Sequence, residues 1–325
     1  EITDAELASD IDEDITNITT DSPEALKYYT QARRYHDNDE YRESIQLMEK
    51  AVEIDPEFAM AYRSLAVSYG NMRLFAEEKK YIEKALDLAG RLPDRERYQI
   101  TGTYYGTTEK TYDKSNEAYQ KLLELYPDDA TANHNLGRNF YALEQWDKAI
   151  ERYEKAVKHE TEFVGTYTQL ANSCRAKEMY TKAKEVLELY LSRFGEHEAI
   201  RRGLATLYRT QGQLDLAQEE ADKAFLLAPD DWQNFQLKGD LYLYQGELEK
   251  AEEEYRKMLM GHDPAGQGWG GARLANLYCY QGRFTQASEI WKQNISAARQ
   301  ANQETWEGMS FYGLAVACYQ AGNLE

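Results

Sequence analysis

The stretch NHNLGRNFYALEQWDKAI, residues 133–150, gathers asparagine, histidine and arginine in a chain whose formal net charge is −19. A guanidinium can form two hydrogen bonds to one carboxylate, and an asparagine amide can pair with the N–H and C=O groups of a peptide. These residue types therefore suit recognition of an acidic or extended polypeptide. Which of them act together depends on the elements that carry them.

The other residues that could do chemistry form no catalytic or metal-binding set. The segment GQGWGG at 266–271 matches G-x-G-x-x-G. A dinucleotide site also needs a preceding strand in a βαβ unit, so we interpret this segment as a connecting loop. Cys174, Cys279 and Cys318 include no C-x-x-C pair, and the five histidines lack the i, i+4 spacing of a helical zinc site. The sequence thus predicts no enzyme activity, no metal and no cofactor.

Length and charge disfavour several classes of protein. A 325-residue chain with 42% hydrophobic residues can bury a substantial core. It contains no apolar run near the roughly 20 residues that span a bilayer, and its N-terminus lacks the features of a secretory signal. Because 57 acidic residues outnumber 38 basic ones, binding to nucleic acid or insertion into a membrane is not expected. We expect a cytoplasmic location, although a membrane anchor in the parent chain stays open.

Internal repetition dominates the sequence. The chain has only six prolines, it favours helix throughout, and its residue types recur at a spacing of about 34 residues. Two helices approach closely only where a side chain is nearly absent, so a recurring small residue marks the crossing of a helical hairpin. Such a residue occurs at nine positions: Ala32, Ala66, Gly102, Gly137, Ala171, Ala205, Gly239, Ala275 and Ala315.

The second helix of each predicted hairpin has a pattern of its own. A small residue is followed four residues later by a larger apolar one, as in Ala149 with Tyr153. Pro56, Pro127 and Pro229 come where the second helix must end and the chain must turn. The pattern predicts an acidic leader at 1–24 and about nine units over 25–325, the last incomplete. These units open near residues 25, 59, 95, 130, 164, 198, 232, 268 and 308.

This pattern resembles the tetratricopeptide repeat family. The resemblance implies an all-α fold, a right-handed superhelical α-solenoid of helix-turn-helix hairpins. The order of units, with SPEALKYYTQARRYHDNDEYRES first and DRERYQITGTYY third, is also similar to the repeat region appended to some multidomain bacterial serine/threonine kinases and regulators. The sequence contains no kinase element, so this second likeness implies a sensing or docking role without phosphotransfer.

The resemblance further implies that the first helices of the hairpins line a concave groove. At the groove positions of units four to six no residue is acidic, so we expect a positive, amide-rich strip there. The strip lacks the lysine of the family's carboxylate clamp, which predicts an extended, acidic partner segment rather than a chaperone tail. The predicted ligand-binding residues are His134, Asn135, Arg138, Thr168, Gln169, Asn172, Arg175, Arg202 and Arg209, with Asn276 extending the track.

Two classes of function stay open at this point. The first is a protein-protein interaction scaffold that binds a protein or peptide in its groove, and the second is a sensory or regulatory appendage that recognises a small ligand. The arginines could also serve only to balance neighbouring glutamates. In the incomplete last unit Phe311, Leu314 and Val316 should leave part of an apolar face uncovered, which predicts weak self-association there.

Overall fold

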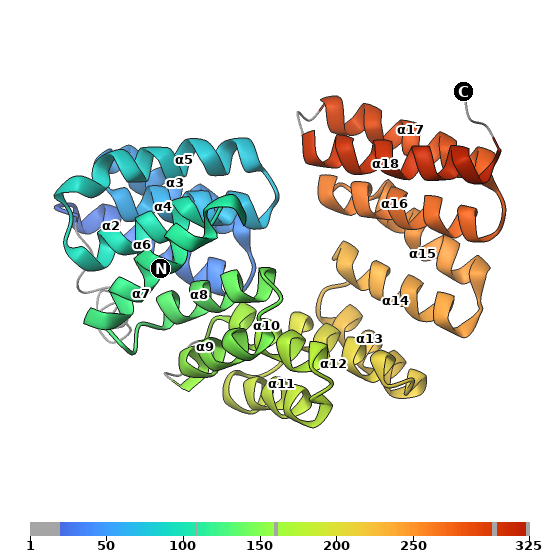
Figure 1. Ribbon diagram of the computed structural model, residues 1–325, viewed down its shortest axis with the longest axis horizontal. Helices are drawn as coiled ribbons and strands as arrows, with labels where there is room; N and C mark the ends of the chain where they lie inside the picture. The colour runs from blue at the N-terminus through green and yellow to red at the C-terminus, as the bar shows by residue number, and fades with distance from the viewer. Residues whose placement is uncertain (1–19, 108, 159–161, 301–303, 323–325) are drawn as a thin grey trace. The chain divides into compact units, whose positions relative to one another are not determined.

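A computed structural model describes residues 20–107, 109–158, 162–300 and 304–322. Within these residues the chain forms seventeen α-helices, two short 3₁₀ helices and no strand (Figure 1). None of the described helices is long and apolar enough to span a membrane. Most of the predicted acidic leader, residues 1–19, lies outside the described part of the chain.

The chain divides into two compact units, each made of several repeats: the first unit is Glu1–Lys182 and the second unit is Ala183–Glu325. Helix α11, Tyr180–Phe194, contains the division between them. The helices of the first unit are α2 (Pro23–Asp37), α3 (Tyr41–Ile54), α4 (Ala59–Asn71), α5 (Phe75–Leu88), η1 (Ala89–Arg91), α6 (Asp94–Tyr105), η2 (Glu109–Thr111), α7 (Tyr112–Leu125), α8 (Ala130–Ala142), α9 (Trp146–Lys158) and α10 (Val164–Ala176). Those of the second are α12 (Glu198–Thr210), α13 (Leu214–Leu227), α14 (Trp232–Gln245), α15 (Leu248–Met260), α16 (Pro264–Tyr280), α17 (Phe284–Gln300) and α18 (Glu304–Gln320).

Helices pack in consecutive hairpins, and the first helices of neighbouring hairpins also touch. In the first unit α2 contacts both α3 and α4, and α8 contacts both α9 and α10. In the second unit the first helices contact each other in the order α12, α14, α16 and α18. Each unit therefore carries a layer of first helices beside a layer of second helices, and a side chain on the first layer can have neighbours from several repeats.

The hairpins close where a small residue of the first helix meets a large ring of the second. A Cβ atom added to Gly102, Gly137 or Gly239 would lie 2.6, 2.9 or 2.5 Å from the nearest atom of a tyrosine ring. The tyrosine facing Gly137 is Tyr153, which is fully buried. The prediction that this column of small residues marks the helix crossings is confirmed at these three glycines, whereas Ala315 of α18 is exposed. The glycines are needed because the buried ring fills the space that a side chain would take.

The turns inside the hairpins share one backbone feature. In the first unit Asp39, Arg73, Glu144 and Glu178 have positive φ, between 56° and 62°. In the second unit the same turns carry Gly212, Gly246, Gly282 and Gly322, again with positive φ. Left-handed backbone costs an L-residue about 1–2 kcal/mol and glycine nothing of that kind. The first unit thus makes its turns at a cost that the second unit avoids.

The segment GQGWGG is helical, so its interpretation as a connecting loop is wrong. Helix α16 starts at Pro264, and the side chain of Asp263 caps it by accepting hydrogen bonds from the N–H groups of Ala265 and Gly266 at 2.9 and 3.0 Å. A Cβ atom on Gly270 would lie 2.7 Å from the backbone nitrogen of Leu259 on α15. Close packing on α15 outweighs the weak helix propensity of glycine.

Replacing Gly137 by alanine should strain the crossing of α8 and α9, because the new methyl group meets the ring of Tyr153 at 2.9 Å. We expect Gly137→Ala to lower the free energy of unfolding by about 1–3 kcal/mol, as overpacking does. The matched control is Gly90→Ala, since a Cβ atom at Gly90 meets nothing within 4 Å. Urea unfolding followed by circular dichroism measures both, and equal midpoints for the two variants would contradict the crossing geometry.

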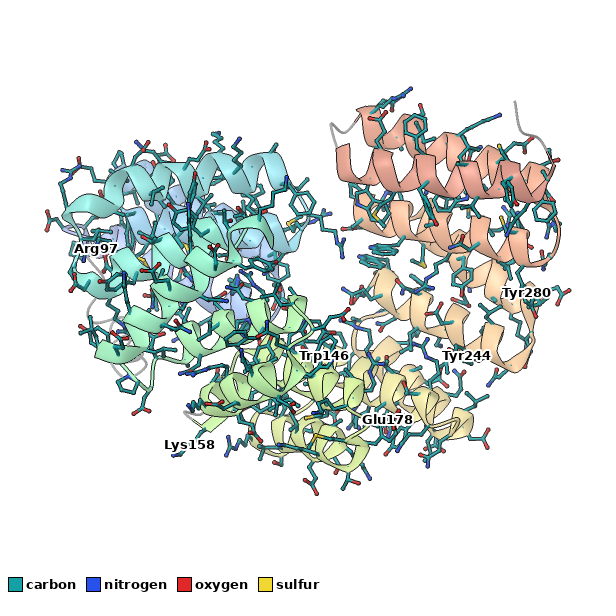
Figure 2. The ribbon with its side chains drawn as sticks, viewed as in Figure 1. Arg97, Trp146, Lys158, Glu178, Tyr244 and Tyr280 are labelled. Atoms are coloured by element: carbon teal, nitrogen blue, oxygen red, sulfur yellow. The ribbon has the colours of Figure 1, made fainter. Side chains whose placement is uncertain are left out.

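Glu178, at the turn between α10 and α11, has a φ of 58° and an exposed side chain (Figure 2). Glu178→Gly should therefore raise the free energy of unfolding by about 1 kcal/mol through relief of left-handed strain. The mirror-image variant Gly212→Ala introduces that strain in the second unit and should lower stability by a similar amount. Thermal melts compare the two, and a Glu178→Gly protein that melts below the wild type would argue against strain at this turn.

Candidate ligand-binding surfaces of the first helices

Helix α8 places His134 half-buried against aromatic rings of the first unit. The imidazole lies 4.8 Å from the ring of Phe163 and 5.6 Å from that of Tyr153, measured between centroids. Its Nδ1 atom is 3.0 Å from the hydroxyl oxygen of Thr166. Burial, reinforced by the nearby guanidinium of Arg138, lowers the pKa of His134 to about 3. This imidazole is therefore neutral at physiological pH and offers a ligand no charge.

The other two predicted residues of α8 also interact within the chain. The amide of Asn135, which is 7% exposed, donates to the backbone oxygen of Thr131 at 2.9 Å. Arg138 interacts electrostatically with Glu78 of α5: burial raises the pKa of that carboxyl, and the arginine works against the rise. Asn135 and Arg138 thus have partners in their own chain. These two side chains are therefore less available to a ligand than the sequence predicted.

The first repeat reaches the fifth through an aromatic contact. His36, on α2, lies 5.5 Å from the ring of Phe163, the residue that precedes α10. Tyr41 of α3 contacts the same histidine at 5.4 Å. Phe163 therefore sits against two histidines, His36 and His134, from repeats far apart in sequence. The first-helix layer of this unit is partly filled by its own side chains at this point.

Helix α10 presents polar groups that are less engaged. Thr168 donates its hydroxyl to the backbone oxygen of Gly165 at 3.1 Å, so it is used locally. The side-chain oxygen of Gln169 and the Nε atom of Arg175 are buried and have no hydrogen-bond partner in the described part of the chain. No carboxylate of those residues pairs with Arg175, and Asn172 lies half-buried one turn before it. Arg175 is thus a cation that folding leaves unneutralised.

In the second unit Arg202 is already paired. Its guanidinium lies 2.5 Å from a carboxylate oxygen of Asp231 and 3.8 Å from one of Glu198. It also lies 3.4 Å from the side-chain oxygen of Asn234. With two carboxylates beside it, Arg202 carries no excess positive charge. Through Asp231, Arg202 links α12 to the start of α14.

Arg209 belongs to a cluster around one buried carboxylate. Asp240, 7% exposed, accepts a hydrogen bond from Arg209 at 3.0 Å and another from the hydroxyl of Tyr255 at 2.8 Å. Arg273 of α16 lies 3.5 Å from the same carboxylate. Two guanidinium groups therefore share one negative charge. Asn276, on the exposed side of α16, follows Arg273 by three residues and so lies on the same helix face.

Sequence reasoning missed the partners Asp231 and Asp240 and the second cation, Arg273. Asp240 comes from the repeat after the one that carries Arg209, 31 residues along the chain, and Asp231 caps the start of α14, 29 residues after Arg202. The groove positions of repeats four to six include none of these three residues. The same positions in α14 and α16 contain Asp240 and Arg273, whereas Asp231 precedes α14 and holds no groove position.

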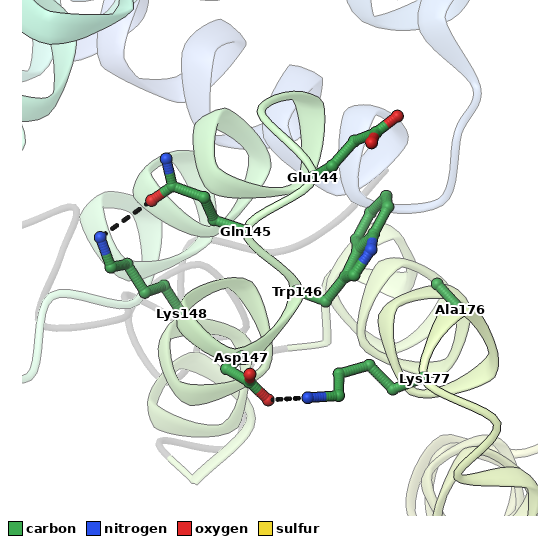
Figure 3. Close-up of a pocket in the computed structure, with 7 residues that line it drawn as sticks. All are labelled: Glu144, Gln145, Trp146, Asp147, Lys148, Ala176 and Lys177. Atoms are coloured by element: carbon green, nitrogen blue, oxygen red, sulfur yellow. Dashed lines mark hydrogen bonds and ion pairs between the residues drawn. The ribbon is translucent and has the colours of Figure 1, made fainter.

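A shallow hollow of about 350 Å³ lies near the turns of the fourth and fifth repeats (Figure 3). Asp147 and Lys177 are joined across it at 2.6 Å, and Lys148 contacts the side chain of Gln145 at 2.9 Å, so its charges are satisfied. The indole of Trp146 packs edge-on against Tyr141. The hollow is lined by Glu144, Gln145, Trp146, Asp147, Lys148, Ala176 and Lys177.

No reactive set accompanies these surfaces in the described residues. Those residues contain no group of three or more His, Cys, Asp or Glu side chains that could hold a metal ion. Burial raises the pKa of the Cys174 thiol to about 11 and raises that of Cys279 as well. A thiol so protonated is a weak nucleophile at neutral pH.

Models of the tetratricopeptide repeat match residues 25–58, 102–163 and 169–268, and the chain belongs to this family. A crystal structure of the APC/C hetero-tetramer Cut9-Hcn1 contains a chain of the same fold. It superposes with a TM-score of 0.64 at 16% identity, over 96% of this chain and 57% of that one. The all-α repeat solenoid predicted from the sequence is confirmed.

Curated relatives match part of the chain. The RNA polymerase-associated protein CTR9 of Caenorhabditis elegans is 26% identical over 157 residues, which is 47% of this chain. The peroxisomal targeting signal receptor of Kluyveromyces lactis is 29% identical over 147 residues, 45% of this chain. The matches cover only 13% and 25% of the lengths of these two relatives. Proteins of this family generally mediate protein-protein interaction.

The enclosure of His134 predicts an imidazole that does not titrate between pH 4.5 and pH 8. Because its folded pKa of about 3 is below the ordinary value near 6.5, the unfolded chain binds the extra proton, and stability falls as pH drops through that window. From pH 7 to pH 5 the loss should be about 2 kcal/mol. Histidine-selective NMR of wild type and His134→Asn identifies the signal, and a midpoint near 6.5 would show an exposed ring.

Proposed function

We propose that this chain is a protein-binding module whose first helices hold an extended, acidic segment of a partner. The observation that carries the proposal is the excess of cations over carboxylates on these helices. Arg175 has no carboxylate partner in the described residues, and Arg209 and Arg273 share Asp240. An acidic segment would supply the missing charges through forked hydrogen bonds. The relatives named as targeting-signal receptors fit a chain that binds another polypeptide.

Only part of the strip predicted from the sequence is included in the proposed binding residues. His134, Asn135, Arg138 and Thr168 interact within the chain, and Arg202 is neutralised by two carboxylates. The residues proposed to meet a ligand therefore form a separate surface on each unit: Gln169, Asn172 and Arg175 on the first, and Arg209, Arg273 and Asn276 on the second. The expectation that the arginines only balance neighbouring carboxylates thus holds for Arg202. Arg209 shares its carboxylate with Arg273, and Arg175 has no carboxylate partner in the described residues.

The test uses a fluorescein-labelled peptide that alternates aspartate with serine, and a lysine-serine peptide as its counterpart. Fluorescence anisotropy should show binding of the acidic peptide alone, and the affinity should fall as salt is added. Arg175→Glu should weaken it at least about tenfold, the equivalent of about 1.4 kcal/mol. Arg175 is preferred to Arg202, because reversing Arg202 would also release Asp231 and Glu198 and confound folding with binding.

The matched control is Arg91→Glu, an arginine of η1 whose side chain is exposed and pairs only with the exposed Glu57. It should bind the acidic peptide as the wild type does. The proposed function is overturned if the acidic peptide binds no better than the lysine-serine peptide. It is overturned equally if Arg175→Glu and Arg91→Glu reduce binding to the same extent.

A further inference from the structure

Four tyrosines of the second unit are exposed to an unusual degree. Tyr244, Tyr280, Tyr312 and Tyr319 are 67%, 76%, 75% and 73% exposed. They belong to the first helices α14, α16 and α18. Several large rings exposed on one layer of helices indicate an interaction surface, whereas a single exposed leucine does not. Tyrosine is enriched where proteins meet, because it offers a large surface at a small entropic cost.

The tyrosines recur at related positions of consecutive repeats. Tyr244 and Tyr280 occupy the same position of consecutive repeats, five residues after the small crossing residue, and lie at the same edge of the unit (Figure 2). On α18 the exposed side chains of Met309, Tyr312, Val316 and Tyr319 recur at intervals of three and four residues, which places them on one helix face.

The crossing register links this face to the cluster. Asp240, Asn276 and Val316 occupy the same repeat position on α14, α16 and α18, directly after Gly239, Ala275 and Ala315. These three helices pack against each other in that order. The exposed face of α18 is therefore the continuation of the surface on which Arg209, Asp240 and Arg273 meet. Arg209 reaches toward the tyrosines as well, since its guanidinium lies 5.4 Å from the ring of Tyr244.

The charge on this surface differs from that of the chain as a whole. The only charged residue of α16 is Arg273, and its Nε atom is buried without a hydrogen-bond partner. On α14 the single carboxylate is Asp240, which the two arginines already hold. From residue 308 to 320, α18 carries no charge. In a chain with a net charge of −19, the surface combines low negative charge, a surplus cation and exposed rings.

We propose that the surface formed by α14, α16 and α18 takes the part of a partner segment that carries large apolar side chains between its carboxylates. This inference rests on the proposed function and specifies the partner's chemistry. Arg273 and Arg209 receive a carboxylate, while Tyr280, Tyr312 and Tyr319 cover the apolar side chains beside it. A second copy of this chain is a poorer occupant, because two acidic chains repel each other. Nucleic acid is poorer still, since few cations face it.

The test compares three fluorescein-labelled peptides by anisotropy: aspartate alternating with leucine, aspartate with serine, and asparagine with leucine. The aspartate-leucine peptide should bind at least about tenfold more tightly than either of the others, since tenfold corresponds to about 1.4 kcal/mol. The double variant Tyr280→Ala, Tyr319→Ala should reduce its affinity to that of the aspartate-serine peptide. Leu226→Ala is the matched control, because Leu226 is 81% exposed on the second helix α13, and it should change nothing.

Equal affinity for the aspartate-leucine and aspartate-serine peptides would overturn the inference, as would wild-type affinity in the tyrosine variant. In either case binding that still depends on Arg175 would leave the proposed function standing, whereas failure of both acidic peptides would remove it. In sedimentation velocity, a wild-type dimer that the tyrosine variant dissociates would assign the surface to a second copy. Tighter binding of a thymidine oligonucleotide than of any peptide would assign it to nucleic acid.

Discussion

The contact between a small residue and a buried ring is the constraint on which the rest of this structure depends. Gly102, Gly137 and Gly239 each lie against a tyrosine of the following helix, at a distance that excludes a side chain. In these three hairpins the ring fills the space between the two helices, which fixes the crossing point and the face that each hairpin turns toward its neighbour. Because each hairpin packs mainly on the next, one local contact repeated along the chain specifies the stack.

Many charged side chains of this protein form ion pairs between neighbouring repeats. Several ion pairs join residues about one repeat apart, such as Arg95 with Asp129 at 2.9 Å and Arg283 with Glu252 at 2.9 Å. The carboxylate of Asp129 is fully enclosed, so this pair is shielded from salt and its loss would leave a charge buried. An acidic chain thereby uses much of its basic complement between repeats. Among the described residues Arg175 differs from these arginines, because no carboxylate there pairs with it.

The two units solve the same turn differently, which bears on how they tolerate change. In the second unit glycine takes the left-handed position after the first helix, whereas in the first unit charged residues such as Arg73 and Glu144 occupy it. The second unit also carries the longest helices, α16, α17 and α18, with 17 residues each. The longer spacing of its last repeats is thus absorbed into helix.

The sequence by itself determined the helices, the hairpins and their crossings, because these depend on periodic local patterns: Gly137 and Tyr153 already stood in register with their counterparts in other repeats. It also determined which residues belong to the first helices. Only the tertiary structure decided what those residues can do. His134 became a half-buried neutral ring because Phe163, the residue before α10, packs against it, and Arg209 became paired because Asp240 follows it by 31 residues. Burial and ion pairing depend on neighbours distant in sequence, which periodicity does not encode.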